Sequence, residues 1–209
     1  MSAHCHDHAC PSSNAHDPGW RRALWIALVL NAAMFGLEFW GGWQADSAAL
    51  LADALDFAGD ALNYGLSLAV LHWAAVWASR VAWLKGWTMG LYGLGVLAYA
   101  GHLAWTGSTP QPPTMGLIGM LALGTNVAVA VLLYRYRGGD ANAQSVWLCS
   151  RNDAIGNALV MLAALGVWGS GTAWPDLIVA SVMAALGISA AWRVVAQARH
   201  ELKGQAHTA

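Results

Sequence analysis

Charged residues are scarce in this chain, and their scarcity excludes most classes of soluble protein. Asp, Glu, Lys and Arg make up 10% of the 209 residues, whereas hydrophobic residues make up 57%. Ordinary globular domains carry roughly 25% charged residues. The formal net charge of −1 excludes a basic nucleic-acid-binding protein, and 3 Cys cannot hold together a small secreted scaffold. The composition predicts a polytopic membrane protein that is surrounded by lipid and binds no nucleic acid.

Six segments are long and apolar enough to cross a bilayer, which takes about 20 residues each. They cover residues 20–43, 47–77, 84–106, 114–136, 141–168 and 174–199. Short breaks with turn-forming residues lie between most of them. The predicted fold class is all-α, with six transmembrane helices in one transport domain over residues 19–200 and a short cytoplasmic tail at 201–209.

The basic residues predict the orientation of these helices, because Lys and Arg gather on the cytoplasmic side of a membrane. Nine of them lie at the start of the first segment, around alternate breaks and near or after the end of the last segment: Arg21, Arg22, Arg80, Lys85, Arg135, Arg137, Arg193, Arg199 and Lys203. No signal peptide is recognisable ahead of the first segment. We expect a multi-pass protein of the cytoplasmic membrane with both termini in the cytoplasm.

The first 18 residues form a polar segment that is rich in His and Cys, and the composition predicts disorder. Such flexible ligands could capture cytoplasmic metal, or they could be incidental residues of a solvated tail. The residues concerned are His4, Cys5, His6, His8, Cys10 and His16.

Three acidic residues inside the second segment are the main functional signal, because carboxylates within a bilayer are costly and mark functional sites. Asp53, Asp56 and Asp60 lie within roughly 60° of one another around a helix, and Asn63 extends the same stripe. Asp56 and Asp60 are one turn apart and could bind the same ion. A stripe that only packs against neighbouring helices is the alternative, but three carboxylates without a nearby cation make poor structural contacts.

The fifth segment offers a matching pair, Cys149 and Asp153, which are also one helical turn apart. The second and fifth segments enter the membrane from opposite sides, so both pairs are expected near its midplane. Asp56, Asp60, Cys149 and Asp153 could then hold one tetrahedral ion such as Zn²⁺ or Cd²⁺. Metal would displace protons from such a crowded acidic site. The prediction is a transporter, not an enzyme, with divalent metal and protons as substrates and no cofactor.

These residues resemble the cation diffusion facilitator family. The stretch SAALLADALDFAGD at 47–60 looks like the family's second-helix signature, whose metal-binding pair is H-x-x-x-D or D-x-x-x-D. CSRNDAIGN at 149–157 lies where the family has its fifth-helix pair, and WPDLIVA at 174–180 is similar to its sixth helix. The resemblance covers nearly all of 20–200 and implies a homodimeric, proton-coupled exporter of divalent metal by alternating access.

Two departures from the family pattern affect these expectations. Cys149 stands where the family usually has His, and a softer sulfur ligand favours Cd²⁺ beside Zn²⁺. The chain also stops soon after the last segment, so we expect the family's C-terminal cytoplasmic domain to be absent. A dimer would then depend on its helices, and the third segment is the predicted interface through its small residues, Gly86, Gly90, Gly93 and Gly95.

Other polar residues within the predicted helices would support the site or line the ion path: Asp53, Asn63, Glu38, Arg151 and Asn157. Arg151 is expected to pair with Asp53 or Glu38, or to contact backbone carbonyls. Glu38 shares a face of the first helix with Asn31, where the two could line the entry path or form an interhelical contact.

Two alternative functions are weaker. A membrane metal sensor would use the Cys/His-rich tail as its receptor, but the sequence contains no signalling domain. A membrane redox protein would bind haem through His72 and His102, but these residues are predicted at different depths. The metal exporter is the favoured hypothesis.

Overall fold

The computed structural model describes residues 18–69, 75–136 and 141–206, apart from the side chains of 75–78, 141–152, 155, 201 and 204–206. The described residues form six helices and no strand: α1 (Pro18–Gln44), α2 (Ala48–Ala69), α3 (Ala75–Thr106), α4 (Pro112–Tyr134), α5 (Ala141–Ser170) and α6 (Trp174–Ala206). The prediction of an all-α fold with six helices is confirmed. α6 continues beyond residue 199, where the sequence placed the end of the last span.

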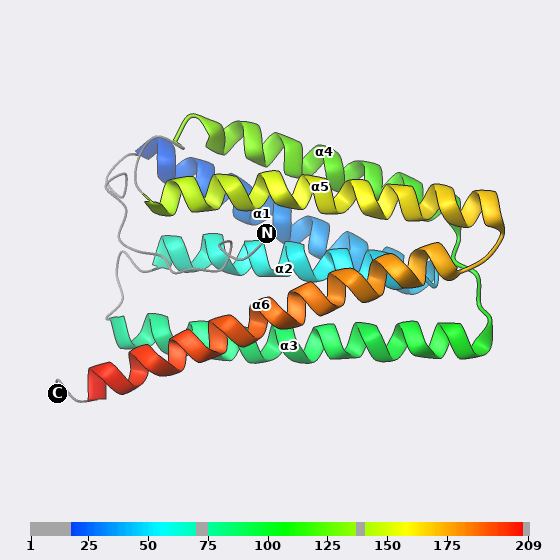
Figure 1. Cartoon of the computed structure of the whole chain (residues 1–209). Coiled ribbons are helices and arrows are strands. Elements are labelled where there is room, and N and C mark those ends of the chain that lie inside the picture. The colour runs from blue at the N-terminus through cyan, green and yellow to red at the C-terminus, as the bar shows by residue number, and fades with distance from the viewer. Residues whose placement is uncertain (1–17, 70–74, 137–140, 207–209) are drawn as a thin grey trace.

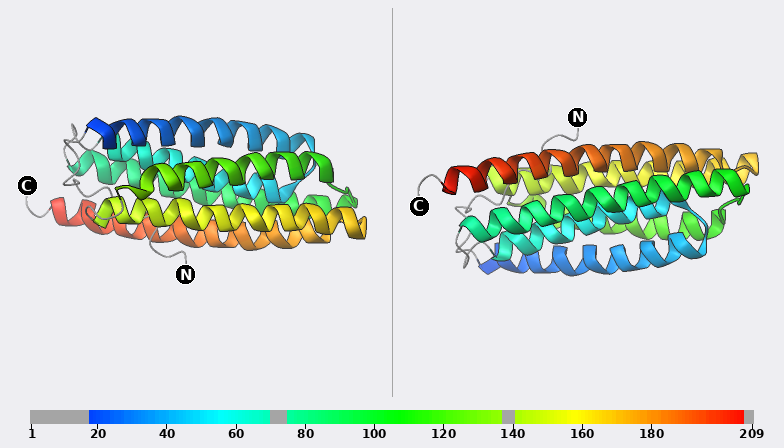
Figure 2. Two further views of the ribbon diagram at one scale, coloured as in Figure 1. Left: turned by 90° about the horizontal axis from the view of Figure 1, so that it is seen from above. Right: turned by 90° about the horizontal axis from the view of Figure 1, so that it is seen from below.

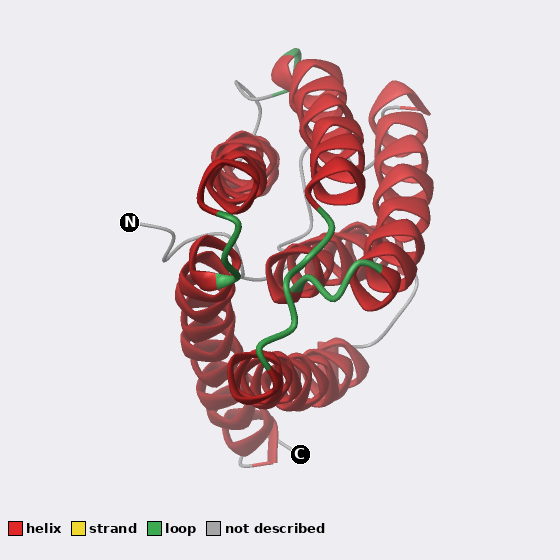
Figure 3. Ribbon diagram, turned by 90° about the vertical axis from the view of Figure 1, so that its right-hand side faces the viewer, coloured by secondary structure: helices red, strands yellow, loops and turns green. Residues whose placement is uncertain are grey.

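The helices lie side by side along one long axis, and each runs opposite to the one before it (Figures 1 and 2). The first turn of α1 and the last turn of α6 therefore lie at the same end of the bundle. α2 is the central helix, since it packs against α1, α3, α5 and α6. Figure 3 looks along the bundle and shows the short loops that join α1 to α2, α3 to α4, and α5 to α6 at the opposite end.

Apolar side chains coat the outside of this bundle, as a lipid environment requires. Trp25, Leu91, Val131 and Leu186 are each between half and three-quarters exposed. Among the described residues, three helices are long and apolar enough to cross a membrane by length and composition, over Pro18–Gln44, Pro112–Tyr134 and Trp174–His200. The fold is that of a polytopic membrane protein whose polar residues are gathered inside.

A buried carboxylate fixes the start of α2 to α6. Asp176 is fully buried and accepts a hydrogen bond from Ser47 Oγ at 2.6 Å. It also accepts the backbone N–H groups of Ala48 and Ala49, at 2.9 and 3.2 Å. The first N–H groups of a helix have no partner within it, and the helix dipole favours a negative charge there. Asp176 thus supplies, from another helix, the cap that α2 needs.

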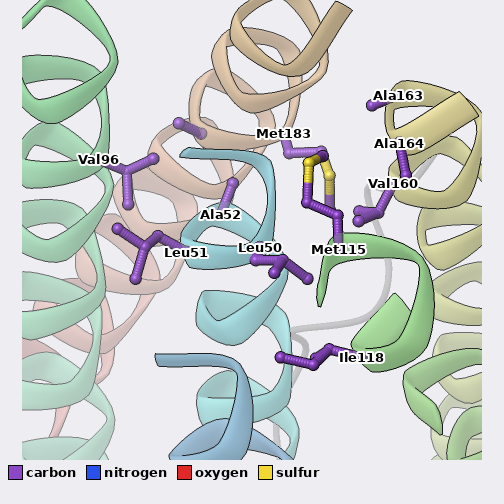
Figure 4. Packing of buried hydrophobic residues seen from close by; sticks show 11 residues of the cluster. Leu50, Leu51, Ala52, Val96, Met115, Ile118, Val160, Ala163, Ala164 and Met183 are labelled. Atoms are coloured by element: carbon purple, nitrogen blue, oxygen red, sulfur yellow. The ribbon is translucent and has the colours of Figure 1, made fainter. Parts of the chain in front are cut away.

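Apolar packing surrounds the same end of α2. The buried cluster in Figure 4 joins Leu50, Leu51 and Ala52 of α2 to side chains of the other helices. The thioether of Met115 on α4 lies against that of Met183 on α6. The α2 residues of this cluster end directly before Asp53, the first acidic residue of the helix.

The boundary between the second and third helices differs from the predicted one. α2 ends at Ala69 and α3 begins at Ala75, whereas the sequence placed a break at 78–83. Arg80, which was expected in that break, and Lys85, which was expected beside it between the two helices, both lie on α3. Arg80 is exposed, but Lys85 is only 4% exposed. The prediction was wrong because a basic residue was taken as a sign of a cytoplasmic loop, whereas Lys85 meets polar groups within the bundle.

The glycines of α3 pack against α6 of the same chain. A Cβ atom at Gly86 would lie 2.7 Å from Val195 Cγ2, and one at Gly93 would lie 2.8 Å from Ile188 Cγ1. A Cβ at Gly90 would lie 3.6 Å from Ala191 Cβ. Small residues do allow close helix contact, but here the contact is internal. The prediction that the Gly86–Gly93 face forms a dimer interface is therefore wrong, and Gly95, which meets nothing within 4 Å, lies off this face.

The cap on α2 can be tested by replacing Asp176. Asp176→Ala leaves a buried hydroxyl and two backbone N–H groups without their acceptor, so we expect the free energy of unfolding to fall by about 1–3 kcal/mol. Denaturant unfolding of the purified protein in detergent micelles measures this. Ser181→Ala is the matched control, because Ser181 donates only to Leu177 O of its own helix. Equal stability of Asp176→Ala and the unmodified protein would contradict the role of the cap.

Candidate metal centre

The acidic residues of α2 lie on a helix that is enclosed by its neighbours. Asp53 is 1% exposed and Asp60 is 6% exposed, while Asp56 is half-buried. Ala54, Leu55 and Phe57, on other sides of the helix, are buried as well. The environment of Asp53 and Asp60 is therefore set by the helices packed around α2 and not by bulk water.

Asp60 and Asp153 come together between α2 and α5. Their side chains are in hydrogen-bond contact, and the Tyr64 hydroxyl donates to Asp60 Oδ2 at 3.1 Å. The contact joins one member of each of the two pairs picked out in the sequence. Two carboxylates in direct contact repel each other unless a proton or a cation lies between them. The pair is therefore suited to hold either a proton or a metal ion.

The other two predicted ligands are each one turn away along the same helices. Asp56 precedes Asp60 on α2, and its charge acts on Glu38 of α1. Cys149 precedes Asp153 on α5, but its side chain lies outside the described residues. Among the described side chains, no three His, Cys, Asp or Glu residues form a group that could hold a metal ion. The structure brings Asp60 and Asp153 together, and the complete set of four ligands stays a prediction.

Glu38 and Asp53 form a second carboxyl pair, nearer to the start of α2. Both are buried, at 0% and 1% exposure, and their side chains are within hydrogen-bonding reach of each other. Neither Glu38 oxygen, nor Asp53 Oδ2, meets any further hydrogen-bond partner in the described part of the chain. Arg151, the expected partner of one of these acids, has its side chain outside the described residues. Glu38 of α1 and Asp53 of α2 thus contact each other at the interface between the two helices.

Buried amides on three further helices continue the polar interior. Asn31 on α1, Asn126 on α4 and Asn157 on α5 are at most 2% exposed. Asn31 Nδ2 donates to Ala27 O at 2.8 Å, but Asn31 Oδ1, Asn126 Oδ1 and both polar atoms of Asn157 have no hydrogen-bond partner among the described residues. Buried polar atoms of this kind are normally satisfied by water or an ion. Sequence reasoning missed Asn126, although an amide in so apolar a segment was a usable signal.

A lysine borders the site from the side of α3. Lys85 Nζ donates to Asn63 Oδ1, and its charge acts on Asp60. Asn63 follows Asp60 by three residues and lies on the same side of α2. Sequence reasoning placed Lys85 between two helices and so did not connect it with the site.

The remaining residues with metal-binding chemistry do not join this site. The tail residues lie outside the described part of the chain: His4, Cys5, His6, His8, Cys10 and His16. His72 is outside it too, while His102 is exposed on α3. The described residues therefore contain no pair of histidines that supports haem binding.

Comparison with known proteins points to one family. Residues 24–80, which contain all the acidic residues of α2, match the family model described as the cation efflux transmembrane domain. The chain is 23% identical over 215 residues to a "Cadmium, cobalt and zinc/H(+)-K(+) antiporter" of Bacillus velezensis. That alignment covers 95% of this chain and 66% of the relative, so the chain spans just under two thirds of the relative's length.

The bundle with its acidic central helix is that of a polytopic membrane protein. In residues 24–80 the chain is similar to the cation efflux transmembrane domain, in agreement with the resemblance of its second-helix signature to the cation diffusion facilitator family.

The contact between α2 and α5 predicts which carboxylates matter for metal binding. Asp60→Asn and Asp153→Asn should each weaken Zn²⁺ binding by at least about 10- to 100-fold, because each removes a negative charge from the same small volume. Calorimetric titration of the purified protein measures the affinity. Asp46→Asn makes the same change at an exposed loop residue that bonds Tyr99 and Ser108, and it should bind normally. If Asp60→Asn and Asp153→Asn both bind Zn²⁺ with normal affinity, the metal site does not lie between these two residues.

Proposed function

We propose that this protein exports a divalent transition-metal cation across the cytoplasmic membrane in exchange for protons. The contact between the Asp60 and Asp153 side chains carries the proposal. It lies inside a bundle with an apolar surface, and it joins two helices that start at opposite ends of the bundle. An ion held there contacts both α2 and α5, so a shift of one helix relative to the other changes its coordination. That is the requirement for a site that opens alternately to the two sides of a membrane.

The proposed ligands are Asp56, Asp60, Cys149 and Asp153. Side chains four residues apart lie on the same face of a helix, so Asp56 and Cys149 can complete the coordination that Asp60 and Asp153 begin. Three carboxylates and a thiolate suit Zn²⁺ and Cd²⁺, whereas Mn²⁺ prefers a site made only of oxygen and nitrogen. The name of the Bacillus velezensis relative includes cadmium, cobalt and zinc, which supports this substrate class.

Protons are the proposed counter-ions. Carboxyl groups in contact cannot all be ionised without a cation, so the empty site holds protons that an entering metal ion displaces. Metal and protons then occupy the site in turn. Re-entry of protons down their gradient returns the empty transporter and drives the outward movement of metal.

The proposed orientation has both termini in the cytoplasm, in line with the positions of the exposed basic residues. Arg21, Arg80, Arg135 and Arg199 all lie near the end of the bundle where α1 begins and α6 ends. This distribution is typical of the cytoplasmic side of a membrane. We propose a homodimer whose interface lies away from the α3 face covered by α6.

Transport can be tested with the protein in proteoliposomes under an imposed pH gradient. Uptake of Zn²⁺ and Cd²⁺ should follow the direction of the gradient and vanish in Asp60→Asn, while Mn²⁺ uptake should be low. Metal flux that is independent of the pH gradient would contradict proton exchange. The absence of any metal flux would contradict transport.

The ligand role of Cys149 predicts a change of metal preference. Thiolate stabilises Cd²⁺ more than imidazole does, so Cys149→His should shift the relative affinity toward Zn²⁺. Cys149→Ala should lower Cd²⁺ affinity more than Zn²⁺ affinity. Both measurements use a protein in which Cys5 and Cys10 are Ser, so that only one thiol changes. If Cys149→Ala binds both ions normally while Asp153→Ala binds neither, the thiol is not a ligand.

A further inference from the structure

Lys85 is the only buried Lys or Arg among the side chains that the structure describes, and it is 4% exposed. The other described basic side chains on the helices, such as Arg80 and Arg135, are exposed. A positive charge inside an apolar bundle is costly unless negative or polar groups surround it. The position of Lys85 therefore depends on what it meets inside the bundle.

The ammonium group of Lys85 is directed toward the acidic face of α2. Nζ donates a hydrogen bond to Asn63 Oδ1, and the positive charge acts on Asp60. Asn63 follows Asp60 by three residues on α2, so its hydrogen bond holds the ammonium of Lys85 beside the metal site. Lys85 thus adds a fixed positive charge at the edge of a strongly acidic site.

The backbone that carries Lys85 is held in place. The next residue, Gly86, packs so closely against α6 that a Cβ atom there would lie 3.1 Å from Ala191 O. α3 packs more extensively against α6 than any other two helices pack together. The ammonium can swing on its side chain, but its anchor cannot move away from the site independently of α6.

We propose that Lys85 is a tethered counter-cation of the metal site, which neutralises Asp60 in part when metal is absent and repels the metal ion when it is bound. This inference rests on the proposed function. A transporter must release its ion as well as bind it, and several anionic ligands in a low-dielectric interior would hold a divalent ion too tightly. A nearby fixed charge of the same sign as the metal weakens binding and favours release.

The test compares variants of Lys85 by calorimetric titration with Zn²⁺ and by transport in proteoliposomes. Lys85→Gln should tighten Zn²⁺ binding by about tenfold and lower the maximum transport rate by a similar factor, because release slows. Lys85→Arg keeps the charge and should keep the affinity within about threefold. Arg80→Gln removes an exposed positive charge from the same helix and is the matched control, with unchanged affinity.

A second variant separates the charge of Lys85 from its hydrogen bond. Asn63→Ala leaves the ammonium without its amide partner and free to approach Asp60, so Zn²⁺ binding should weaken by about tenfold. Lys85→Gln and Asn63→Ala thus shift the affinity in opposite directions. A lysine that only supports the fold would lower or preserve affinity in both variants.

The outcomes distinguish this inference from the proposed function. If the unmodified protein binds no Zn²⁺, the proposed function fails and the inference with it. If the unmodified protein binds Zn²⁺ through Asp60, but Lys85→Gln does not bind it more tightly, the inference alone is overturned. If Lys85→Gln does not fold, Asn63→Ala decides the test. Zn²⁺ binding by Asn63→Ala that is unchanged or tighter than in the unmodified protein overturns the inference.

Discussion

The structure depends on one constraint, the burial of carboxyl groups of α2 inside a bundle with an apolar surface. α2 lies at the centre of the bundle, and two of its acidic residues, Asp53 and Asp60, are buried. Each meets a group that can share a proton, a hydrogen bond or a cation with it. Asp53 meets Glu38, and Asp60 meets Asp153 and Tyr64. The interior is therefore polar where the surface is apolar, as expected for a protein that moves a charged species through lipid.

The elements around α2 fix the start of that helix and pack along it beside its acidic residues. Asp176 and the apolar cluster fix the start of α2 to α6 and to the neighbouring helices. Farther along α2, Leu55, Phe57 and Tyr64 belong to further apolar clusters. Asp53 and Asp60 meet polar groups whose contacts a proton or metal ion can alter. Lys85 lies beside Asn63 and Asp60, and its helix, α3, packs closely against α6 through its glycines. Apolar packing and exchangeable polar contacts thus occur side by side along the same helix.

The sequence predicted the helices because spans need a minimum apolar length, and it predicted the stripe of Asp53, Asp56 and Asp60 because helical periodicity fixes their face. It did not predict which helix would cover the glycines of α3, since small residues favour close packing within a chain as much as between chains. It also placed Lys85 outside the bundle, because a single charge in sequence does not reveal the Asn63 that stabilises it inside. The partner of Asp60 could be named only because two separate i, i+4 pairs suggested the same site.

The central claim is that Asp60 and Asp153 share a proton that a metal ion displaces. Calorimetric titration of Zn²⁺ in buffers of different ionisation enthalpy counts the protons released for each ion bound. The account predicts proton release by the unmodified protein, and less release in Asp60→Asn or Asp153→Asn wherever residual binding remains measurable. Zn²⁺ binding at this site without any release of protons would contradict it.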